Sequence, residues 1–292
     1  TGDTEVFASY RNNTGLETPI KFGVQLYNPS NDTINVTVKN RGFRTSGPTT
    51  GDWNYVVGQT PTDFLNYTAT NSFTIGPYLS KWVYNELGPI LNGSLFNCYV
   101  RFTTDAAVWC FPYAYTSLSN IDGTATLYPW VDNAPNNTHR GYGDTCQLGS
   151  WFTLLTSQMP YSYATSSCAY NNGEDIIPIN DQGKIWNCDT PGRNLGNWGA
   201  HYNFHVTVKN DTNYTYTING HIGTNSINLT PIIKFNNIVK YTNLNNSANK
   251  GRWNWVVETE LLPNTSITFN YEYIMGAQSF APAIHSWTAI RR

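Results

Sequence analysis

Histidine is the residue type in this chain with the most specific chemistry, because its imidazole binds metal ions. The five histidines are His139, His201, His205, His221 and His285. The spacing of His201 and His205 chelates one ion on a helix, but on a strand it separates the side chains by about 13 Å. Pairing of His205 with His221 across two strands is the alternative that would still form a site. The pattern favours histidines on a solvent-exposed face, so we expect no metal site.

Two other kinds of polar chemistry are weakly indicated. An oxygen-rich loop could hold calcium, although its spacing is not that of an EF-hand. Its members are Asn171, Asn172, Glu174, Asp175, Asn180 and Asp181. Hydrolysis would require two carboxylates or a Ser/His/Asp set in a cleft. The 19 acidic residues are scattered and no Gly-x-Ser-x-Gly motif is present. We therefore expect a protein that is not an enzyme and that requires no cofactor.

The cysteines predict one disulfide bond, between Cys98 and Cys110. The residues between them predict two strands joined by a turn at 103–105, and pairing about Thr104 sets the two cysteines opposite each other. Because no C-x-x-C pair is present, a zinc ribbon or a thioredoxin site is not indicated. The other cysteines fall in one segment, where at most two can pair: Cys146, Cys168 and Cys188.

Aromatic residues are the most unusual feature of the chain, with 10 tryptophans and 20 tyrosines. Aromatic rings stack on sugar rings, so an exposed aromatic strip on a β-sandwich is suited to carbohydrate binding. Trp53 and Trp253 are expected in the core, because they occupy matched positions in a repeat described below. Four others are candidates for an interface or for stacking on a glycan: Trp82, Trp109, Trp151 and Trp186.

The composition is that of a folded chain with few charges. Of 292 residues, 40% are hydrophobic and 12% are charged, and the net charge is -2. Without a basic cluster, electrostatic binding to nucleic acid is disfavoured. No apolar run approaches the ~20 residues that cross a bilayer as a helix. Because the chain begins Thr1-Gly2-Asp3 and keeps its surface polar through Asn, Thr and Ser, we expect an extracellular or cell-surface protein after removal of a signal peptide.

Strand patterns dominate the chain, and helix patterns are nearly absent. From Ala200 to Val208, apolar and polar residues alternate strictly, and the same period of two recurs in 20–26, 34–38, 214–218 and 267–273. Turn-forming residues separate these runs at spacings of about 8 to 12 residues, which is typical of an antiparallel sandwich. We predict an all-β fold with two antiparallel β-sandwich domains of the immunoglobulin or jelly-roll kind.

An internal repeat favours duplication of one sandwich, with chance recurrence as the alternative. Val-Thr-Val-Lys-Asn occurs at 36–40 and at 206–210, and Gly-Asp-Trp-Asn-Tyr-Val-Val at 51–57 resembles Gly-Arg-Trp-Asn-Trp-Val-Val at 251–257. Asn92-Gly-Ser-Leu and Asn264-Thr-Ser-Ile are a weaker match, as are Phe111-Pro112 and Phe280-Ala-Pro282.

The predicted domains are a sandwich over 1–131, a loop-rich connection over 132–197 that contains three of the cysteines and a candidate short helix at 149–159, and a second sandwich over 198–292.

Asn-x-Ser/Thr triplets are more frequent than the composition predicts. Two interpretations stay open: asparagine-rich turns, or N-glycosylation. The triplets begin at Asn12, Asn31, Asn35, Asn66, Asn92, Asn136, Asn210, Asn213, Asn228, Asn245 and Asn264.

Four segments resemble a group of secreted β-rich surface proteins from Gram-positive bacteria that have no settled activity and are sometimes labelled copper-amine-oxidase-like. They are Glu5-Val-Phe-Ala-Ser-Tyr-Arg-Asn-Asn-Thr, Phe22-Gly-Val-Gln-Leu-Tyr-Asn-Pro, Gly123-Thr-Ala-Thr-Leu-Tyr-Pro-Trp and Leu195-Gly-Asn-Trp-Gly-Ala-His-Tyr-Asn-Phe. The motifs are structural, so no catalytic residue is carried over and no copper ligand set matches the label. The resemblance implies an exported cell-surface or matrix protein and disfavours glycosylation by the eukaryotic route.

Three functions follow from these features. The first is an extracellular structural protein that self-associates into a filament, surface layer or matrix through exposed strand edges. The second is a carbohydrate-binding adhesin, and the third is a viral capsid or spike protein. For the first, the strand over 4–10, which places Val6, Ala8 and Tyr10 on one face, is a candidate for donation to a second subunit. The alternative is that this strand pairs within its own sandwich.

Overall fold

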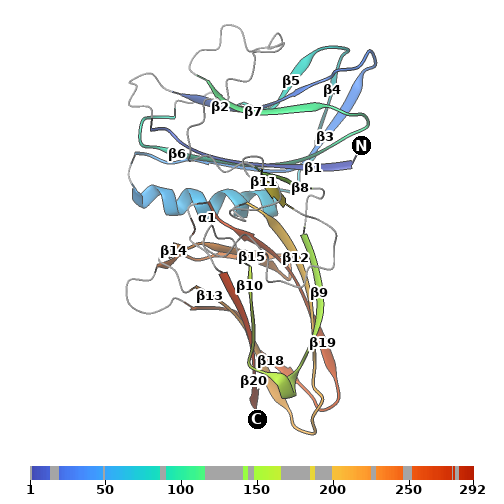
Figure 1. Cartoon of the computed structure of the whole chain (residues 1–292), viewed down its shortest axis with the longest axis vertical. Coiled ribbons are helices and arrows are strands. Elements are labelled where there is room, and N and C mark those ends of the chain that lie inside the picture. Colours follow the sequence, from blue (N-terminus) through green and yellow to red (C-terminus); the bar gives the residue numbers. More distant parts are fainter. Residues whose placement is uncertain are drawn as a thin grey trace. The chain divides into compact units, whose positions relative to one another are not determined.

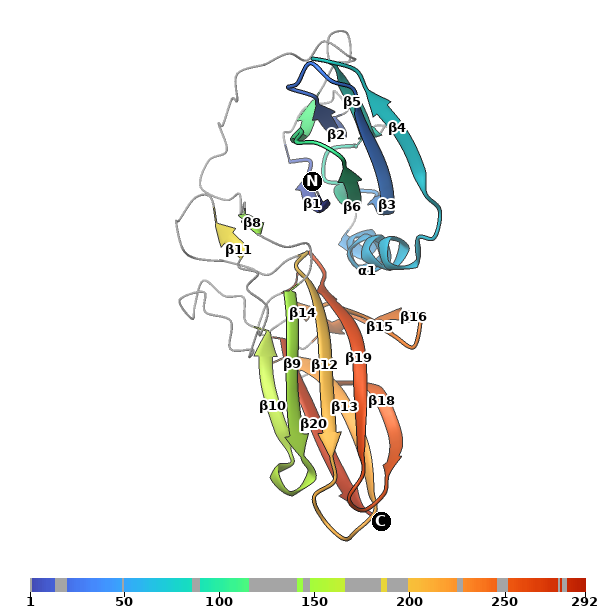
Figure 2. The ribbon, with the colours of Figure 1, turned by 90° about the vertical axis from the view of Figure 1, so that its right-hand side faces the viewer.

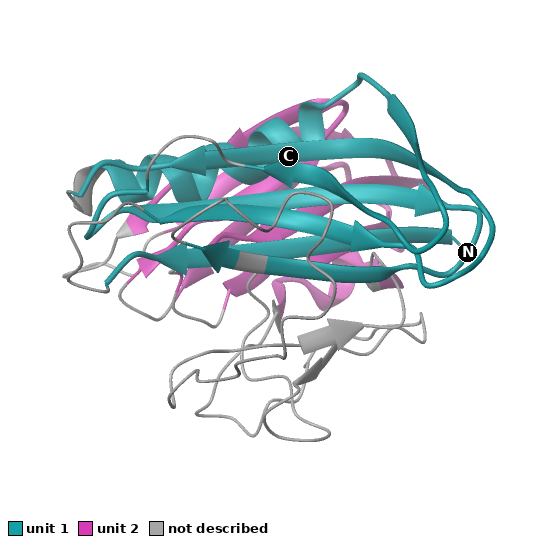
Figure 3. Cartoon of the chain, turned by 90° about the horizontal axis from the view of Figure 1, so that it is seen from above, with its two compact units in different colours: residues 1–138 teal, residues 139–292 magenta. Residues whose placement is uncertain are grey.

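The computed structural model of this chain is predominantly β and divides into two compact units, residues 1–138 and residues 139–292 (Figures 1 and 3). It describes residues 2–13, 20–48, 50–85, 90–115, 141–143, 148–165, 185–187, 199–224, 228–245, 252–277, 279 and 283–292. Within these residues, no helix is long and apolar enough to cross a membrane. Each unit contains a β-sandwich, so the predicted all-β sandwich fold is confirmed.

The first sandwich packs a four-stranded sheet against a three-stranded sheet. The four-stranded sheet has the order β1 (Gly2–Arg11), β6 (Leu95–Thr104), β3 (Ile34–Thr45), β4 (Asn71–Ile75). The three-stranded sheet has the order β5 (Ser80–Asn85), β2 (Lys21–Tyr27), β7 (Trp109–Tyr115). The core between them includes Val24, Val36, Phe96 and Phe102, all at most 1% exposed. At the start of β3, Ile34, Val36 and Val38 are buried and Asn35 is exposed, which explains the period of two in that segment.

Helix α1 (Thr50–Asn66) packs on β3 and β6 of the first sandwich. Its composition disfavours a helix, since it contains two glycines, several β-branched residues and Pro61. Gly42 on β3 lets the helix approach closely, because a Cβ atom there would lie 2.2 Å from the carbonyl oxygen of Thr60. Val56 and Phe64, two residues of the helix, are buried. Packing, rather than intrinsic propensity, therefore holds this segment helical.

The second sandwich packs a four-stranded sheet against a five-stranded sheet, which we call sheet E. The four-stranded sheet has the order β10 (Tyr161–Thr165), β20 (Ala283–Arg291), β13 (Tyr216–Thr224), β18 (Arg252–Leu261). Sheet E has the order β16 (Ile238–Tyr241), β15 (Pro231–Phe235), β19 (Ser266–Met275), β12 (His201–Lys209), β9 (Leu148–Leu155). Short elements complete the unit: the 3-10 helix η1 (Thr156–Gln158), β8 (Gly141–Gly143) with β11 (Ile185–Asn187), and β14 (Asn228–Leu229) with β17 (Leu244–Asn245).

The two sandwiches have the same strand order. In chain order, β1, β2, β3, β4, β5 and β6 correspond to β10, β12, β13, β18, β19 and β20, and each occupies the same place in its sheet. One place differs: β7 pairs antiparallel with β2, whereas β9 fills the corresponding place beside β12 and runs parallel to it. The predicted duplication is thus visible in the topology.

Individual residues also correspond between the two sandwiches. A buried asparagine follows β2 in the first sandwich and β12 in the second, and the two make equivalent hydrogen bonds. The Asn28 side-chain amide donates to the carbonyl oxygens of Asp32, Ile75 and Gly76, at 2.6, 3.1 and 3.0 Å. The Asn210 amide donates to those of Tyr214, Leu261 and Leu262, at 2.7, 3.3 and 3.0 Å. The contacted turns also match, since Tyr78 and Asn264 have φ of 55° and 56° and each follows a proline.

The sequence matches used to predict the duplication join non-equivalent positions and are wrong as an alignment. Residues 51–57 lie in α1, whereas 252–257 lie in β18. Val-Thr-Val-Lys-Asn falls in β3 and at the end of β12, and the Asn92 and Asn264 turns precede β6 and β19, which do not correspond. Phe111 and Pro112 lie in β7, and residues 280–282 lie outside the described part of the chain.

The signal for the true repeat was present, as Phe-x-Val-x-Leu-x-Asn-x-Ser at 22–30 and Phe-x-Val-x-Val-x-Asn-x-Thr at 204–212.

The predicted domain boundaries also require correction. Residues 148–165, assigned to the connection, supply strands β9 and β10 of the second sandwich. The candidate helix at 149–159 is instead mostly β9, followed by the single turn of η1. Its run of Trp, Phe, Thr and Leu suits a half-buried strand, and the sheet supplies the partner that a short apolar run cannot reveal by itself.

Candidate functional site

Strand β12 positions polar side chains on the outer face of sheet E. Tyr202, Phe204, Val206 and Val208 face the core and are 0% exposed, as the alternation predicted. The intervening residues project to the other face, where β12 lies between β9 and β19 (Figure 2). The side chains on this part of the face are therefore spaced by the pairing of three adjacent strands.

Trp151 and His205 form an aromatic pair on this face. They are directly paired residues of β9 and β12. Their rings are parallel within 2°, with centroids 5.6 Å apart, and Trp151 is 44% exposed. His205 Nδ1 also shares a 2.7 Å hydrogen bond with Asn270 Oδ1 on β19. The row from Trp151 to Asn270 thus joins an exposed indole to two groups that form hydrogen bonds.

A second row, of threonines, runs beside the first. Thr153, Thr207 and Thr268 are directly paired across β9, β12 and β19. The hydroxyl oxygens of Thr207 and Thr268 are 2.9 Å apart. We call the two rows together the Trp151 strip; its members are Trp151, His205, Asn270, Thr153, Thr207 and Thr268. Apart from the imidazole, the strip contains only neutral groups.

Charged residues lie beyond one end of the Trp151 strip. Glu272 is 2.7 Å from the Nε2 of His201 and 3.4 Å from the Nζ of Lys234. Burial raises the pKa of Glu272, but the hydrogen bond and charge of His201 and the charge of Lys234 outweigh burial and bring the pKa to about 2. The carboxylate is therefore ionised at neutral pH, and its charge is paired within the protein.

A second aromatic surface lies on the outer face of the three-stranded sheet in the first sandwich. Trp109 on β7 is 48% exposed, and its ring centroid is 5.5 Å from that of Tyr27 and 6.4 Å from that of Phe111. Trp82 on β5 covers Gly23, where an added Cβ would lie 2.3 Å from the indole. The structure therefore brings Trp82 and Trp109 to one sheet face, on either side of β2.

Of the other tryptophans named from the sequence, one packs as predicted, one does not, and one has a side chain outside the described part of the structure. Trp186 belongs to β11, but its side chain lies outside the described part of the structure. Trp253 packs against the second core as expected. Trp53 does not reach a sandwich core, because it lies on α1, where the guanidinium of Arg11 is 4.3 Å from its ring.

Four of the five histidines lie in the described part of the chain. His205 and His221 lie on strands of different sheets, so the cross-strand pairing considered for them is wrong. No group of three or more His, Cys, Asp or Glu side chains with metal-binding geometry occurs in the part of the chain that the structure describes. His139 and the oxygen-rich loop over 171–181 lie outside that part.

The predicted Cys98–Cys110 disulfide is not formed, and both thiols are free. The hairpin that was to align them does not exist, because β6 and β7 belong to opposite sheets of the first sandwich. Cys98 pairs with Ala8 and Phe43, and Cys110 pairs with Leu26. Burial raises the pKa of both thiols, that of Cys110 to about 12, so neither is a reactive thiolate at neutral pH. Cys146, Cys168 and Cys188 lie outside the described residues.

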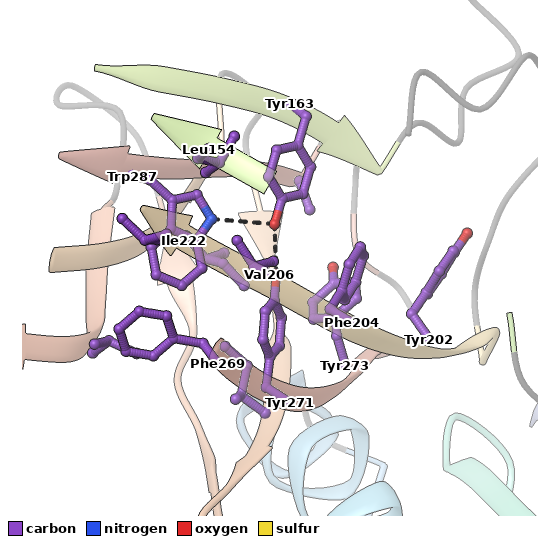
Figure 4. Close-up of a cluster of buried hydrophobic side chains, with 14 of the residues drawn as sticks. Leu154, Tyr163, Tyr202, Phe204, Val206, Ile222, Phe269, Tyr271, Tyr273 and Trp287 are labelled. Atoms are coloured by element: carbon purple, nitrogen blue, oxygen red, sulfur yellow. Dashed lines mark hydrogen bonds between the residues drawn. The ribbon is translucent and has the colours of Figure 1, made fainter. Parts of the chain in front are cut away.

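Polar side chains meet in the core of the second sandwich, and the sequence analysis did not single out three of them, Tyr163, Tyr271 and Trp287 (Figure 4). The hydroxyls of Tyr163 and Tyr271 are 2.7 Å apart, Trp287 Nε1 donates to Tyr163 at 3.3 Å, and Tyr271 lies 3.0 Å from His285 Nδ1. Burial lowers the pKa of His285 to about 3. These side chains are buried and form hydrogen bonds with one another, so their role is in the packing of the sandwich and not in binding a ligand.

Strand β1, the candidate for donation, pairs antiparallel with β6 of its own sandwich from Gly2 to Arg11. Val6 and Ala8 pack against the first core from this edge position. Tyr10, paired with Phe96, continues the same face. In this structure, β1 therefore pairs within its own sandwich, which was the alternative to donation.

No family model matches the chain, and no curated protein matches it. A solved structure described as infectious bursal virus-derived T=1 particles is 11% identical, covers 99% of this chain and 68% of that chain, and has a TM-score of 0.15. A TM-score this low supports no statement about fold or function. The resemblance to secreted surface proteins of Gram-positive bacteria stays a prediction.

Proposed function

We propose that this protein binds neutral carbohydrate chains through the Trp151 strip. The observation that carries the proposal is the 44% exposure of Trp151, which stacks on His205 at the end of a row that continues to Asn270. The C–H face of a pyranose ring stacks on an indole, and its hydroxyls exchange hydrogen bonds with amide and hydroxyl groups. Because strands hold the strip, its groups are already positioned and little ordering entropy is lost on binding.

The charge distribution favours a neutral ligand over an anionic one. Within β9, β12 and β19, the three described strands that carry the strip, Lys209 is the one lysine or arginine. Lys234 on β15 is engaged by Glu272. An acidic glycan would require guanidinium or ammonium groups aimed at it, as phosphate and carboxylate sites do. A strip with one exposed indole, an amide and three hydroxyl groups is instead suited to a neutral sugar chain.

The experiment is titration of the full chain with soluble neutral polysaccharides and their oligosaccharides, monitored by calorimetry and tryptophan fluorescence. We expect binding by the native protein and a loss of affinity of about 5- to 30-fold for Trp151→Ala, since stacking on one ring is worth about 1 to 2 kcal/mol. Trp109→Ala is the matched control, because Trp109 is an equally exposed indole in the other sandwich. Absence of binding by the native protein, or unchanged affinity of Trp151→Ala, would refute the proposal.

A structural role by self-association is a second candidate, and a cell-surface location suits both. It is favoured by the composition of β9, which ends the strand order of sheet E and contains no charged residue and no proline, two features that block association at sheet edges.

A further inference from the structure

Two polar residues lie one row beyond the Trp151 strip on the same face of sheet E. Asn203 on β12 and Glu272 on β19 are directly paired, two residues along from the directly paired His205 and Asn270 of the strip. Because side chains alternate between the two faces of a strand, Asn203 and Glu272 project to the outer face. The residues that flank them along the strands face the core and are at most 1% exposed: Tyr202, Phe204, Tyr271 and Tyr273.

The carboxylate of Glu272 is held by its neighbours and still reaches solvent. Its Oε2 is 2.7 Å from the Nε2 of His201, which is buried, and its Oε1 is 3.4 Å from the Nζ of Lys234. The side chain of Glu272 is nevertheless 26% exposed. An ionised carboxylate has about four acceptor positions, so these two contacts leave positions for the hydroxyl groups of a ligand.

Asn203 complements this carboxylate. Its amide provides two donors and an acceptor, which suits a sugar hydroxyl, because a hydroxyl group both donates and accepts hydrogen bonds. It lies on β12, the strand between β9, which carries Trp151, and β19, which carries Glu272. A ligand that contacts both Trp151 and Glu272 therefore crosses β12 beside Asn203.

The separation of Trp151 and Glu272 sets a minimum size for such a ligand. The two residues are two strands and one row of side chains apart, which places their Cα atoms about 12 Å from each other. One pyranose ring stacked on Trp151 does not extend that far, whereas a chain of two or more sugar units does.

We propose that Asn203 and Glu272 form a second sugar subsite, so that sheet E binds a neutral chain of two or more sugar units that runs obliquely from Trp151 to Glu272. This second subsite rests on the proposed function, because Trp151 supplies the first. Glu272 is ionised at neutral pH, since its pKa is about 2. Its charge strengthens hydrogen bonds from neutral hydroxyl groups and repels the carboxylate or sulfate group of an acidic sugar. Glu272 is therefore the residue that selects neutral sugars.

The test is titration of the full chain with neutral oligosaccharides of increasing length, followed by calorimetry and tryptophan fluorescence. The probes run from the monosaccharide to the hexasaccharide in the cello-, malto-, xylo- and chito- series. We expect the affinity of the native protein to rise with length until both subsites are filled. That gain is expected to shrink by about 10- to 100-fold in Glu272→Gln and by about 3- to 10-fold in Asn203→Ala, because a hydrogen bond to a charged group contributes more than a neutral one. The affinity for the monosaccharide is expected to stay the same in both variants, whereas Trp151→Ala lowers the affinity at every length.

Glu260→Gln is the matched control, because Glu260 is also ion-paired, 3.0 Å from Arg292, but lies on β18 in the other sheet of the sandwich. Asn203→Ala breaks no ion pair, so it tests the subsite even where Glu272→Gln loses stability. Circular dichroism checks that each variant is folded.

Failure of the second subsite and failure of the proposed function give different results. If the native protein binds no series, both are refuted. If the native protein binds and Trp151→Ala weakens binding, but the gain with length is unchanged in Glu272→Gln or in Asn203→Ala, only the second subsite is overturned. An equal loss in Glu260→Gln also overturns it.

Discussion

His285 occupies in the second sandwich the position that Val100 occupies in the first. Val36, the third residue of β3, pairs with Thr104, and Ile218, the third residue of β13, pairs with Ala289. Val100 and His285 each lie four residues before that partner, and both are buried. The same sandwich is therefore built with an apolar residue at this position in one copy and with a hydrogen-bonded histidine in the other. The polar cluster of the second core is not a requirement of the topology.

This relationship predicts how stability depends on pH. The pKa of His285 is about 3 in the folded protein, because burial disfavours the charged form, against about 6.5 in the unfolded chain. Between those values the unfolded chain binds the proton and the folded protein does not, so stability falls as pH decreases, by about 1.4 kcal/mol per pH unit from this group. We expect His285→Val to lose that contribution, as measured by the free energy of unfolding of the second sandwich at pH 7 and pH 5.

The pH range separates His285 from the other groups with shifted pKa values. Glu272 contributes only below its ordinary pKa of 4.5, where protonation weakens its pairing with His201. His221 has a lowered pKa from burial, but it is present in both proteins and cancels in the comparison. Equal pH dependence of native protein and variant would contradict the prediction.

Asn28 and Asn210 are expected to be the most sensitive polar positions outside the two cores. Each side-chain amide donates to three carbonyl oxygens, so replacement by alanine leaves buried acceptors without partners. We predict a loss of about 2 to 4 kcal/mol in the free energy of unfolding of the affected sandwich for Asn28→Ala and for Asn210→Ala. Asn270→Ala, at an exposed asparagine, is the control and should cost less than about 1 kcal/mol; comparable losses for all three would argue against the role described.

Burial also predicts which glycosylation triplets can be used. Asn12 and Asn210 are 0% exposed and donate to backbone carbonyls, whereas Asn213 and Asn264 are exposed. A glycan on a buried amide is incompatible with the folded sandwich. If the chain is secreted from a eukaryotic host, we expect glycans at Asn213 or Asn264 and none at Asn12 or Asn210, by site-resolved glycopeptide mass spectrometry. Occupancy of Asn210 in folded protein would show that its hydrogen bonds are dispensable.

Helix α1 allows a test of whether packing or local sequence makes residues 51–57 helical. The substitutions Asp52→Arg and Tyr55→Trp, both at exposed positions, convert residues 51–57 into the sequence that lies in β18. We expect the double variant to keep α1, because Val56 and Phe64 still pack against β3 and β6. Backbone chemical shifts measured by NMR over 50–66 check this, with the native chain as reference. Strand-like shifts over 51–57 would mean that those two side chains, not packing, select the helix.

The sequence by itself determined that this protein consists of strands and which face of many strands is buried. On β12, Phe204 and Val206 face the core because side chains alternate between the two faces of a strand, and that period is local and visible in the sequence. Trp109 is exposed by the same rule, because its neighbour Cys110 packs against the first core. Trp151 was named as a candidate only because it is a tryptophan without an assigned place in the core.

Only the tertiary structure decided which strands pair and what lies beside each side chain. It separated Cys98 from Cys110 into opposite sheets, placed β9 parallel to β12, and brought Trp151 against His205, which is distant in the sequence. The physical reason is that strand pairing is made by backbone groups that are nearly identical at every residue, so a strand's own sequence specifies its buried face but not its neighbour. The neighbour is selected by how all the buried faces pack together in one core.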